Sequence, residues 1–245
     1  MIAGSQVLIT GGGTGVGADL ARAFTAAGAR VVLAGRRAEP LETVAHGLDG
    51  ARAIPADITD EGSLRALFAA AGPCRIVIAN AGAADSAPFH RTTLEQWNAM
   101  LAVNLTGTFL TLREGLAQIS GPGRLIAVAS TAGLRGYRYV APYAAAKHGV
   151  VGLIRSLALE VAKRPITANA LCPGFLDTEM TTRTLDNITA RTGQSRDQAL
   201  AALTADNPQG RLIRPAEVSA AALWLCAPGS DAINGQAIAI AGGEI

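Results

Sequence analysis

The stretch Thr10-Gly11-Gly12-Gly13-Thr14-Gly15-Val16-Gly17 follows a short aliphatic run, residues 7–9, and leads into an alanine-rich stretch, residues 17–27. A strand, a glycine-rich turn and a helix N-terminus in this order can cradle a pyrophosphate group, because backbone N–H groups and the helix dipole face the anion. A glycine-rich turn without a ligand is the alternative interpretation. The place of the turn after the first of several strands favours a dinucleotide site.

Two glycine spacings fit this stretch. Gly13, Gly15 and Ala18 match G-x-G-x-x-[G/A], whereas Gly11, Gly15 and Gly17 match G-x-x-x-G-x-G. A single glycine pattern is weak evidence, because glycine-rich turns are common. The spacing alone therefore leaves the register of the motif open.

Seven short aliphatic runs alternate with longer, helix-like stretches along the chain. Most of the runs are continuously apolar, which is typical of strands covered on both faces. The predicted strands cover residues 7–9, 31–33, 52–54, 76–78, 125–128, 166–170 and 237–240, and the clearest predicted helices cover residues 17–27, 61–70, 142–163 and 215–226. This alternation predicts a Rossmann-type, doubly wound α/β fold with a seven-stranded parallel sheet and helices on both faces.

The composition supports one compact domain, residues 1–245, because no repeat, linker or charge block marks a boundary. The chain is 49% hydrophobic with a net charge of +2, which excludes charge-driven disorder and argues against a nucleic-acid partner. No apolar run approaches the ~18 residues of a membrane span. One segment, residues 178–210, has no clear place in the alternation, and we expect it to form a substrate lid.

The cysteines and histidines indicate where the protein is located and whether it binds a metal ion. The three cysteines, Cys74, Cys172 and Cys226, are odd in number and widely spaced, which predicts reduced core residues and a cytoplasmic location. No leader segment is evident at the N-terminus. The three histidines are not spaced as metal ligands, so no metal site is expected.

The residues after the second predicted strand bear on the choice of cofactor. An NAD site usually presents Asp or Glu there, about 20 residues beyond the glycine turn, to the ribose 2′-hydroxyl. This chain has Gly35, followed by Arg36 and Arg37, whose guanidinium groups could bind a 2′-phosphate. NADP(H) is therefore favoured, and NAD(H) remains possible. Two solvated arginines are the alternative interpretation.

Tyr143 and Lys147 are four residues apart on the long predicted helix, so their side chains share one face. A nearby ammonium group favours the phenolate and would lower the pKa of Tyr143, which could then exchange a proton with a carbonyl or hydroxyl group. Ser130 lies just after the apolar strand 125–129, at the end where parallel strands meet their ligands, and could hydrogen-bond the same substrate oxygen. The Tyr-x-x-x-Lys pattern alone is weak evidence, because it is common by chance in helices and can consist of ordinary surface residues.

One set of motifs runs through nearly the whole chain: Gly11-x-x-x-Gly15-x-Gly17, Asn80-Ala81-Gly82, Asn104, Ser130, Tyr143 and Lys147. This set resembles the short-chain dehydrogenase/reductase family. The resemblance implies the second glycine register. It also implies that Tyr143 is the general acid/base, that Lys147 lowers its pKa and holds the nicotinamide ribose, that Ser130 orients the carbonyl, and that Asn104 anchors the water of a proton relay.

The same resemblance implies a set of cofactor contacts around the glycine turn and after the later strands. They are Gly11, Gly13, Thr14, Gly15, Val16, Gly17, Gly35, Arg36, Arg37, Asp57, Ile58, Asn80, Ala81, Gly82, Tyr143, Lys147, Pro173, Gly174 and Thr178. The chain departs from the family at one point, because many NADP-preferring members have a basic residue at the position of Thr14. That leaves Arg36 as the main determinant of cofactor preference.

The resemblance extends to 3-oxoacyl thioester reductases, 3-hydroxyacyl-CoA dehydrogenases and polyketide ketoreductases. It implies a ketone or alcohol substrate, with a 3-oxoacyl thioester first, and places specificity in the lid and in residues 131–141. Arginine side chains could bind the phosphates of a CoA or carrier-protein arm. The alternative interpretation is that these arginines are solvated surface charges. The candidates are Arg135, Arg138, Arg183, Arg191 and Arg196.

Two other functions remain open on the sequence. One is an NAD-dependent dehydrogenase of a small alcohol, sugar, steroid or 3-hydroxyacyl-CoA, which the same catalytic residues would support. The other is a dinucleotide-binding regulator without turnover, against which the intact Ser130, Tyr143 and Lys147 argue. The family also implies a homotetramer built through helix 142–163, the long helix before it and C-terminal segments. The small residues of helix 142–163 permit close helix packing.

Overall fold

The computed structural model describes residues 2–245 and contains one seven-stranded sheet in the order β3-β2-β1-β4-β5-β6-β7. Every neighbouring pair of strands is parallel. The strands are β1 (Gln6–Thr10), β2 (Arg30–Gly35), β3 (Arg52–Pro55), β4 (Ile76–Ala79), β5 (Gly123–Val128), β6 (Ile166–Pro173) and β7 (Ala237–Ile240). All seven predicted strands are present, and the doubly wound parallel fold is confirmed.

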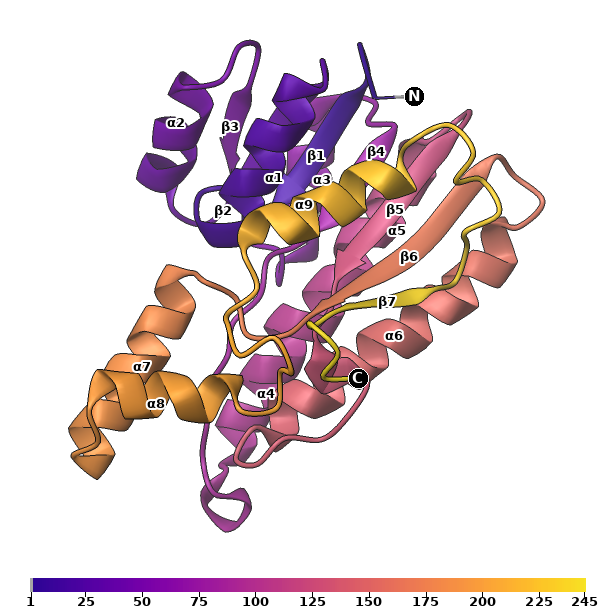
Figure 1. Ribbon diagram of the computed structural model, residues 1–245. Helices are drawn as coiled ribbons and strands as arrows, with labels where there is room; N and C mark the ends of the chain where they lie inside the picture. Colours follow the sequence, from indigo (N-terminus) through magenta and orange to yellow (C-terminus); the bar gives the residue numbers. More distant parts are fainter. Residues whose placement is uncertain (1) are drawn as a thin grey trace.

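Helices cover both faces of the sheet (Figure 1). The helices are α1 (Gly15–Ala26), α2 (Ala38–His46), α3 (Glu61–Ala71), α4 (Leu94–Leu101), α5 (Gly107–Gln118), α6 (Ala141–Val161), α7 (Glu179–Thr192), α8 (Arg196–Thr204) and α9 (Pro215–Leu225). Four of them match the predicted helices to within two residues at each end. The first begins at Gly15 instead of Gly17, because the extended Thr14 is its N-cap.

Two apolar clusters hold the helices to the sheet. On one face, Phe24 of α1, Leu41 of α2 and Leu225 of α9 pack against strand residues such as Ile9. The cluster on the other face includes side chains of α3, α5 and α6, among them Phe68, Leu112 and Ile154. β4, β5 and β6 are buried along their whole length, which explains why their sequences are mostly apolar. The exceptions are Arg124 in β5 and Thr167 and Asn169 in β6.

The strand order changes direction between β1 and β4, because the chain runs outward from β1 to β3 and then returns to pair β4 with β1. In open parallel sheets, ligands bind in the crevice outside the carboxyl ends of the strands at such a point. The glycine-rich turn follows β1, and Asn80 follows β4. The topology therefore brings the predicted site residues to one edge of the sheet.

Residues 178–210 contain two helices, α7 and α8, which project beyond the sheet at the lower left of Figure 1. The two ends of this segment are tied together at its base. Leu176 and Ile213 form an isolated parallel bridge, and the Ile213 carbonyl accepts a hydrogen bond of 2.8 Å from the Asp177 N–H. The segment is thus a folded helical insertion with a fixed base.

Candidate active site

A cavity of about 530 Å³ lies at the carboxyl ends of the strands. Of the predicted catalytic and cofactor residues, only Gly17 is absent from its lining. The lining also includes Arg183, one of the candidate arginines for the substrate arm. Residues that the sequence did not point to complete it: Pro40, Leu41, Ala56, Thr59, Ala83, Val103, Val128, Ala129, Leu176, Glu179 and Met180. The structure therefore brings the predicted set together at one place.

The glycine turn has the backbone geometry of an anion cradle. Gly11 has φ +67°, and a Cβ there would lie 2.8 Å from the Ala81 Cα. A Cβ on Gly17 would lie 2.0 Å from the Gly11 carbonyl oxygen, so α1 can approach the turn only with glycine there. Gly17 thus packs against the turn on the side away from the cavity and does not line the cavity itself. With no acidic residue in its first turn, α1 keeps a positive N-terminus towards the cavity.

Asn80 joins the end of β4 to this turn. Its side-chain Nδ2 donates to the carbonyl oxygens of Thr10 at 3.0 Å and Gly11 at 3.3 Å. In return, the Thr10 hydroxyl accepts the backbone N–H groups of Asn80 at 3.0 Å and Ala81 at 3.1 Å. These bonds fix the two sides of the crevice between β1 and β4.

Arg36 and Arg37 lie exposed at the end of β2, on the cavity lining. Within the described residues, no group forms a hydrogen bond or an ion pair with the Arg36 guanidinium. Asp57 lies after β3, and its Oδ1 accepts hydrogen bonds from the Thr59 backbone N–H at 2.9 Å and hydroxyl at 2.7 Å. These two bonds, with a smaller contribution from the charge of Arg36, lower the pKa of Asp57. An anionic group could bind at Arg36 without displacing a protein partner.

Asn104 is completely buried in a π-helical turn, Ala102–Thr106, between α4 and α5. Its Nδ2 donates to the Ala83 carbonyl at 2.9 Å and the Met100 carbonyl at 3.1 Å, and its Oδ1 accepts from the Ala83 N–H at 3.3 Å. Single π-helical turns inside α-helices are frequent at functional sites. Here the turn places the Asn104 amide beside Gly82, where a Cβ would lie 2.8 Å from Asn104 Oδ1 and 3.7 Å from Lys147 Nζ.

Ser130 and Tyr143 form the polar centre of the cavity. Ser130 follows β5, and its Oγ accepts a hydrogen bond of 3.1 Å from the Ala132 N–H. Burial raises the pKa of Tyr143, a hydrogen bond with the Ser130 hydroxyl opposes this increase, and the Cys172 thiol raises the pKa slightly further. A phenol with a raised pKa stays protonated at neutral pH and can donate its proton.

Lys147 lies one turn after Tyr143 on α6 and is only 4% exposed. Its Nζ donates to the Val128 carbonyl at 2.9 Å and lies 5.6 Å from the centre of the Tyr143 ring. Burial lowers the pKa of Lys147 to about 8. The expectation that Lys147 lowers the pKa of Tyr143 stays a prediction. In this structure the Lys147 ammonium contacts the Val128 carbonyl, and the hydrogen bond with Ser130 opposes the effect of burial on the pKa of Tyr143.

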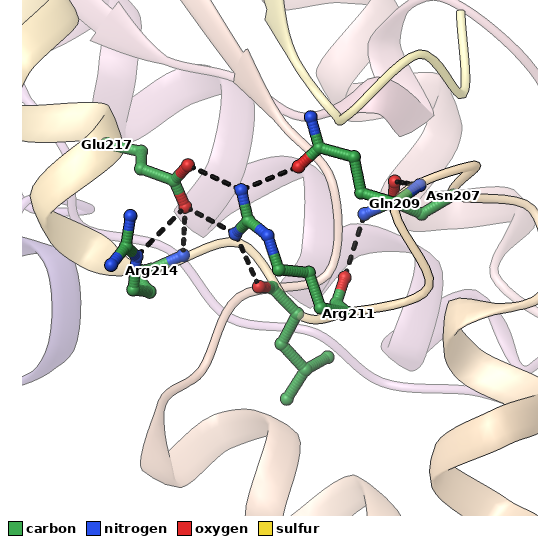
Figure 2. A network of polar contacts seen from close by, with 6 residues as sticks. Asn207, Gln209, Arg211, Arg214 and Glu217 are labelled. Atoms are coloured by element: carbon green, nitrogen blue, oxygen red, sulfur yellow. Dashed lines mark hydrogen bonds and ion pairs between the residues drawn. The ribbon is translucent and has the colours of Figure 1, made fainter.

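A polar network holds the return of the 178–210 segment into α9 (Figure 2). Glu217 accepts hydrogen bonds from the Arg211 guanidinium at 2.7 and 2.8 Å and from the Arg214 N–H at 2.8 Å. Arg211 also donates to Gln209 at 2.6 Å, and the Asn207 amide donates to the Arg211 carbonyl at 2.8 Å. The hydrogen bonds from Arg211 and then Arg214 lower the pKa of Glu217 to about 2.

We expect Glu217→Gln to be less stable than the wild type at neutral pH, because the variant cannot form the paired carboxylate. The carboxylate contributes stability above its ordinary pKa of 4.5 and loses it as the pH falls towards about 2. Thermal denaturation of both proteins across this pH range checks the expectation. The difference in Tm should vanish at the acid end, and a difference that is independent of pH would contradict it.

Comparison with known proteins is consistent with this geometry. A family model described as "Enoyl-(Acyl carrier protein) reductase" matches residues 11–244. The chain is a short-chain dehydrogenase/reductase. As a member of this family, it is an oxidoreductase of the type that acts on CH–OH groups.

Relatives of this short-chain dehydrogenase/reductase align over nearly its full length. A putative ketoacyl reductase from Streptomyces coelicolor is 34% identical, covering 96% of this chain and 95% of its own. A D-beta-hydroxybutyrate dehydrogenase from Cupriavidus necator is 31% identical, and the alignment covers 100% of this chain and 99% of the relative. The crystal structure of a tryptophan variant of the actinorhodin polyketide ketoreductase with NADPH superposes with a TM-score of 0.92 at 33% identity, covering 100% and 98%.

No helix in the described part of this short-chain dehydrogenase/reductase combines the length and the apolar character needed to cross a bilayer.

Proposed function

We propose that this chain reduces a ketone to a secondary alcohol with NADPH, with Tyr143 as the proton donor. The observation that carries the proposal is the convergence of Ser130, Tyr143 and the unpaired Arg36 on one cavity at the switch point of the sheet. When bound, the cofactor supplies a hydride to the carbonyl carbon. The residues that line the cavity would bind the cofactor, orient the substrate and transfer the proton.

The cavity residues fit each part of a dinucleotide. The N-terminus of α1 and the glycine turn would hold the pyrophosphate, Arg36 would bind the ribose 2′-phosphate, and Lys147 would hold the nicotinamide ribose. Asp57 and Ile58 would contact the adenine, and Pro173, Gly174 and Thr178 the nicotinamide end. A structural relative was crystallised with NADPH, which supports this assignment of the cofactor.

Proton transfer would follow from the placement of three side chains. The Ser130 hydroxyl would hydrogen-bond the substrate oxygen beside Tyr143, whose raised pKa keeps its proton available. Asn104, buried near Lys147, would anchor a water that returns a proton to the site. Lys147 carries an ammonium below a pH of about 8 and would complete this relay.

The preferred substrate in this proposal is a 3-oxoacyl thioester on CoA or a carrier protein. Of the five candidate arginines, Arg183 lines the cavity and could meet a phosphate of the arm. Arg135 pairs with Asp206 at 2.9 Å and Arg196 with Asp186 at 2.7 Å, so both already have acidic partners. Residues 178–210 would act as the lid, with Met180, which is 45% exposed, on its inner wall.

Oligomeric state and location belong to the same proposal. We infer a homotetramer built partly on α5 and α6, which expose Phe109 at 41% and Leu159 at 80%. Gly152 has open space beside it and would permit close approach of a second helix, whereas Gly149 packs against Leu105 within the subunit. The three cysteines are free and buried, which supports a cytoplasmic location.

The direct test is turnover by the purified wild type with NADPH and a panel of ketones. We expect a 3-oxoacyl-CoA to be reduced to the 3-hydroxyacyl-CoA faster than simple aliphatic or cyclic ketones. The second candidate, oxidation of a small alcohol or a hydroxy acid with NAD, is favoured by the similarity to D-beta-hydroxybutyrate dehydrogenase. Turnover with NAD and hydroxy acids, with no reduction of any ketone by NADPH, would replace the proposal with that candidate.

A further inference from the structure

A buried carboxylate lies near the C-terminus, outside the set of residues that the proposed function uses. The Glu244 side chain is 3% exposed, and its Oε1 lies 3.8 Å from a guanidinium nitrogen of Arg135. The same Oε1 accepts a hydrogen bond from the Tyr137 hydroxyl. A carboxylate removed from water is costly unless it is paired or hydrogen-bonded, so these partners hold it in place.

The hydrogen bonds around Tyr137 have one consistent direction. A carboxylate only accepts, so the single hydroxyl proton of Tyr137 is donated to Glu244. The Thr131 hydroxyl, 2.7 Å from the Tyr137 oxygen, must then donate to it. Burial, with the hydrogen bond to Glu244, raises the pKa of Tyr137, so the donor stays protonated. The result is a chain from Thr131 through Tyr137 to Glu244.

Thr131 directly follows Ser130 and is 3% exposed. Residues Thr131–Gly133 form a short 3-10 turn whose Ala132 N–H donates to the Ser130 Oγ. A Cβ on Gly133 would lie 2.6 Å from the Lys147 carbonyl oxygen, so the turn is pressed against α6. The direction of the Ser130 hydroxyl therefore depends on the conformation of a turn that Thr131 anchors.

The Glu244 side chain also packs against the loop after β6. A Cβ on Gly174, which lines the cavity, would lie 3.1 Å from the Glu244 Oε2. The Phe175 ring lies edge-on to the Tyr137 ring, with centroids 6.3 Å apart. Glu244 is thus the point where the loop after β5, the loop after β6 and the tail after β7 come together, behind the cavity wall.

We propose that Glu244 is a positioning residue for ketone reduction, which through Tyr137 and Thr131 holds the Ser130 turn in its productive conformation. The inference rests on the proposed function. Glu244 itself does not line the cavity. Its effect is on kcat, because a displaced Ser130 hydroxyl stabilises the developing charge on the substrate oxygen less well.

The test compares the wild type with Glu244→Ala, Glu244→Gln, Tyr137→Phe and the double variant Glu244→Ala/Tyr137→Phe. Kinetics are measured with NADPH and a ketone that the wild type reduces, and the Kd for NADPH is measured separately. We expect Glu244→Ala and Tyr137→Phe each to lower kcat about tenfold, with the Kd unchanged. Glu244→Gln should keep most of the activity, because its amide oxygen still accepts the Tyr137 proton.

The double variant should be no slower than Glu244→Ala alone, because both changes interrupt the same chain. Glu160→Gln, an exposed change on α6, is the matched control and should behave as the wild type. Unchanged kcat in Glu244→Ala, strictly additive losses, or a Glu244→Gln variant as slow as Glu244→Ala would overturn the inference alone. A wild type that reduces no ketone would overturn the proposed function and, with it, this inference.

Discussion

Tyr143→Phe is expected to lower kcat by about 10²–10⁴-fold while the Kd for NADPH stays close to that of the wild type. The substitution removes only the hydroxyl that donates the proton and keeps the ring that packs in the cavity. Burial raises the pKa of this phenol, and the hydrogen bond with Ser130 limits the increase, so the group is a protonated and oriented donor at neutral pH. Loss of the donor should therefore affect the chemical step and not cofactor binding.

The measurement is single-turnover reduction with enzyme in excess, alongside a fluorescence titration of NADPH. Single-turnover rates separate the chemical step from product release, so a fall in the observed rate assigns the effect to chemistry. If Tyr143→Phe reduced the ketone at the wild-type rate, the assignment of the proton donor would be wrong. A parallel loss of NADPH binding would instead indicate that the Tyr143 hydroxyl also contributes to holding the cofactor.

Arg36→Ala is expected to weaken NADPH binding by about ten- to a hundredfold and to leave NADH binding unchanged. A charge-assisted hydrogen bond contributes ~1.5–3 kcal/mol, which corresponds to that range of affinity. Arg36 is exposed on the cavity lining without an ion-pair partner among the described residues, so its guanidinium is available to a phosphate. Gly35, at the end of β2, presents no carboxylate that would repel a 2′-phosphate.

NADH is the internal control for this variant, because the two cofactors differ only in the 2′-phosphate. Titrations of wild type and Arg36→Ala with both cofactors should be made at one ionic strength, since phosphate contacts weaken with salt. Equal or tighter binding of NADH by the wild type would contradict the assignment. It would direct the search towards oxidation of alcohols with NAD.

The parts of the fold that the sequence predicted are those with a local signal. β4, β5 and β6 are covered on both faces, so their sequences are mostly apolar and easy to find. The turn after β1 needs glycine for its backbone conformation, and the glycine spacing is visible in the sequence. Tyr143 and Lys147 share a helix face, so their spacing alone placed them together.

The features that the sequence did not reveal depend on contacts between distant segments. The π-helical turn that contains Asn104 has no signal in the composition of Ala102–Thr106, because it depends on how α4 and α5 pack. Glu244 and Tyr137 are 107 residues apart, and their hydrogen bond exists only once the sheet has assembled. The contact of Lys147 with the Val128 carbonyl likewise joins segments 19 residues apart and has no local signal.

The most direct test of the central claim follows a hydride from the cofactor to the product. The wild type is incubated with a 3-oxoacyl-CoA and NADPH that carries deuterium at C4 of the nicotinamide on the transferred face, and the product is analysed by mass spectrometry. We predict one deuterium on the new carbinol carbon for each cofactor consumed. An alcohol without deuterium, or bound cofactor that is never oxidised in the presence of any ketone, would contradict the account.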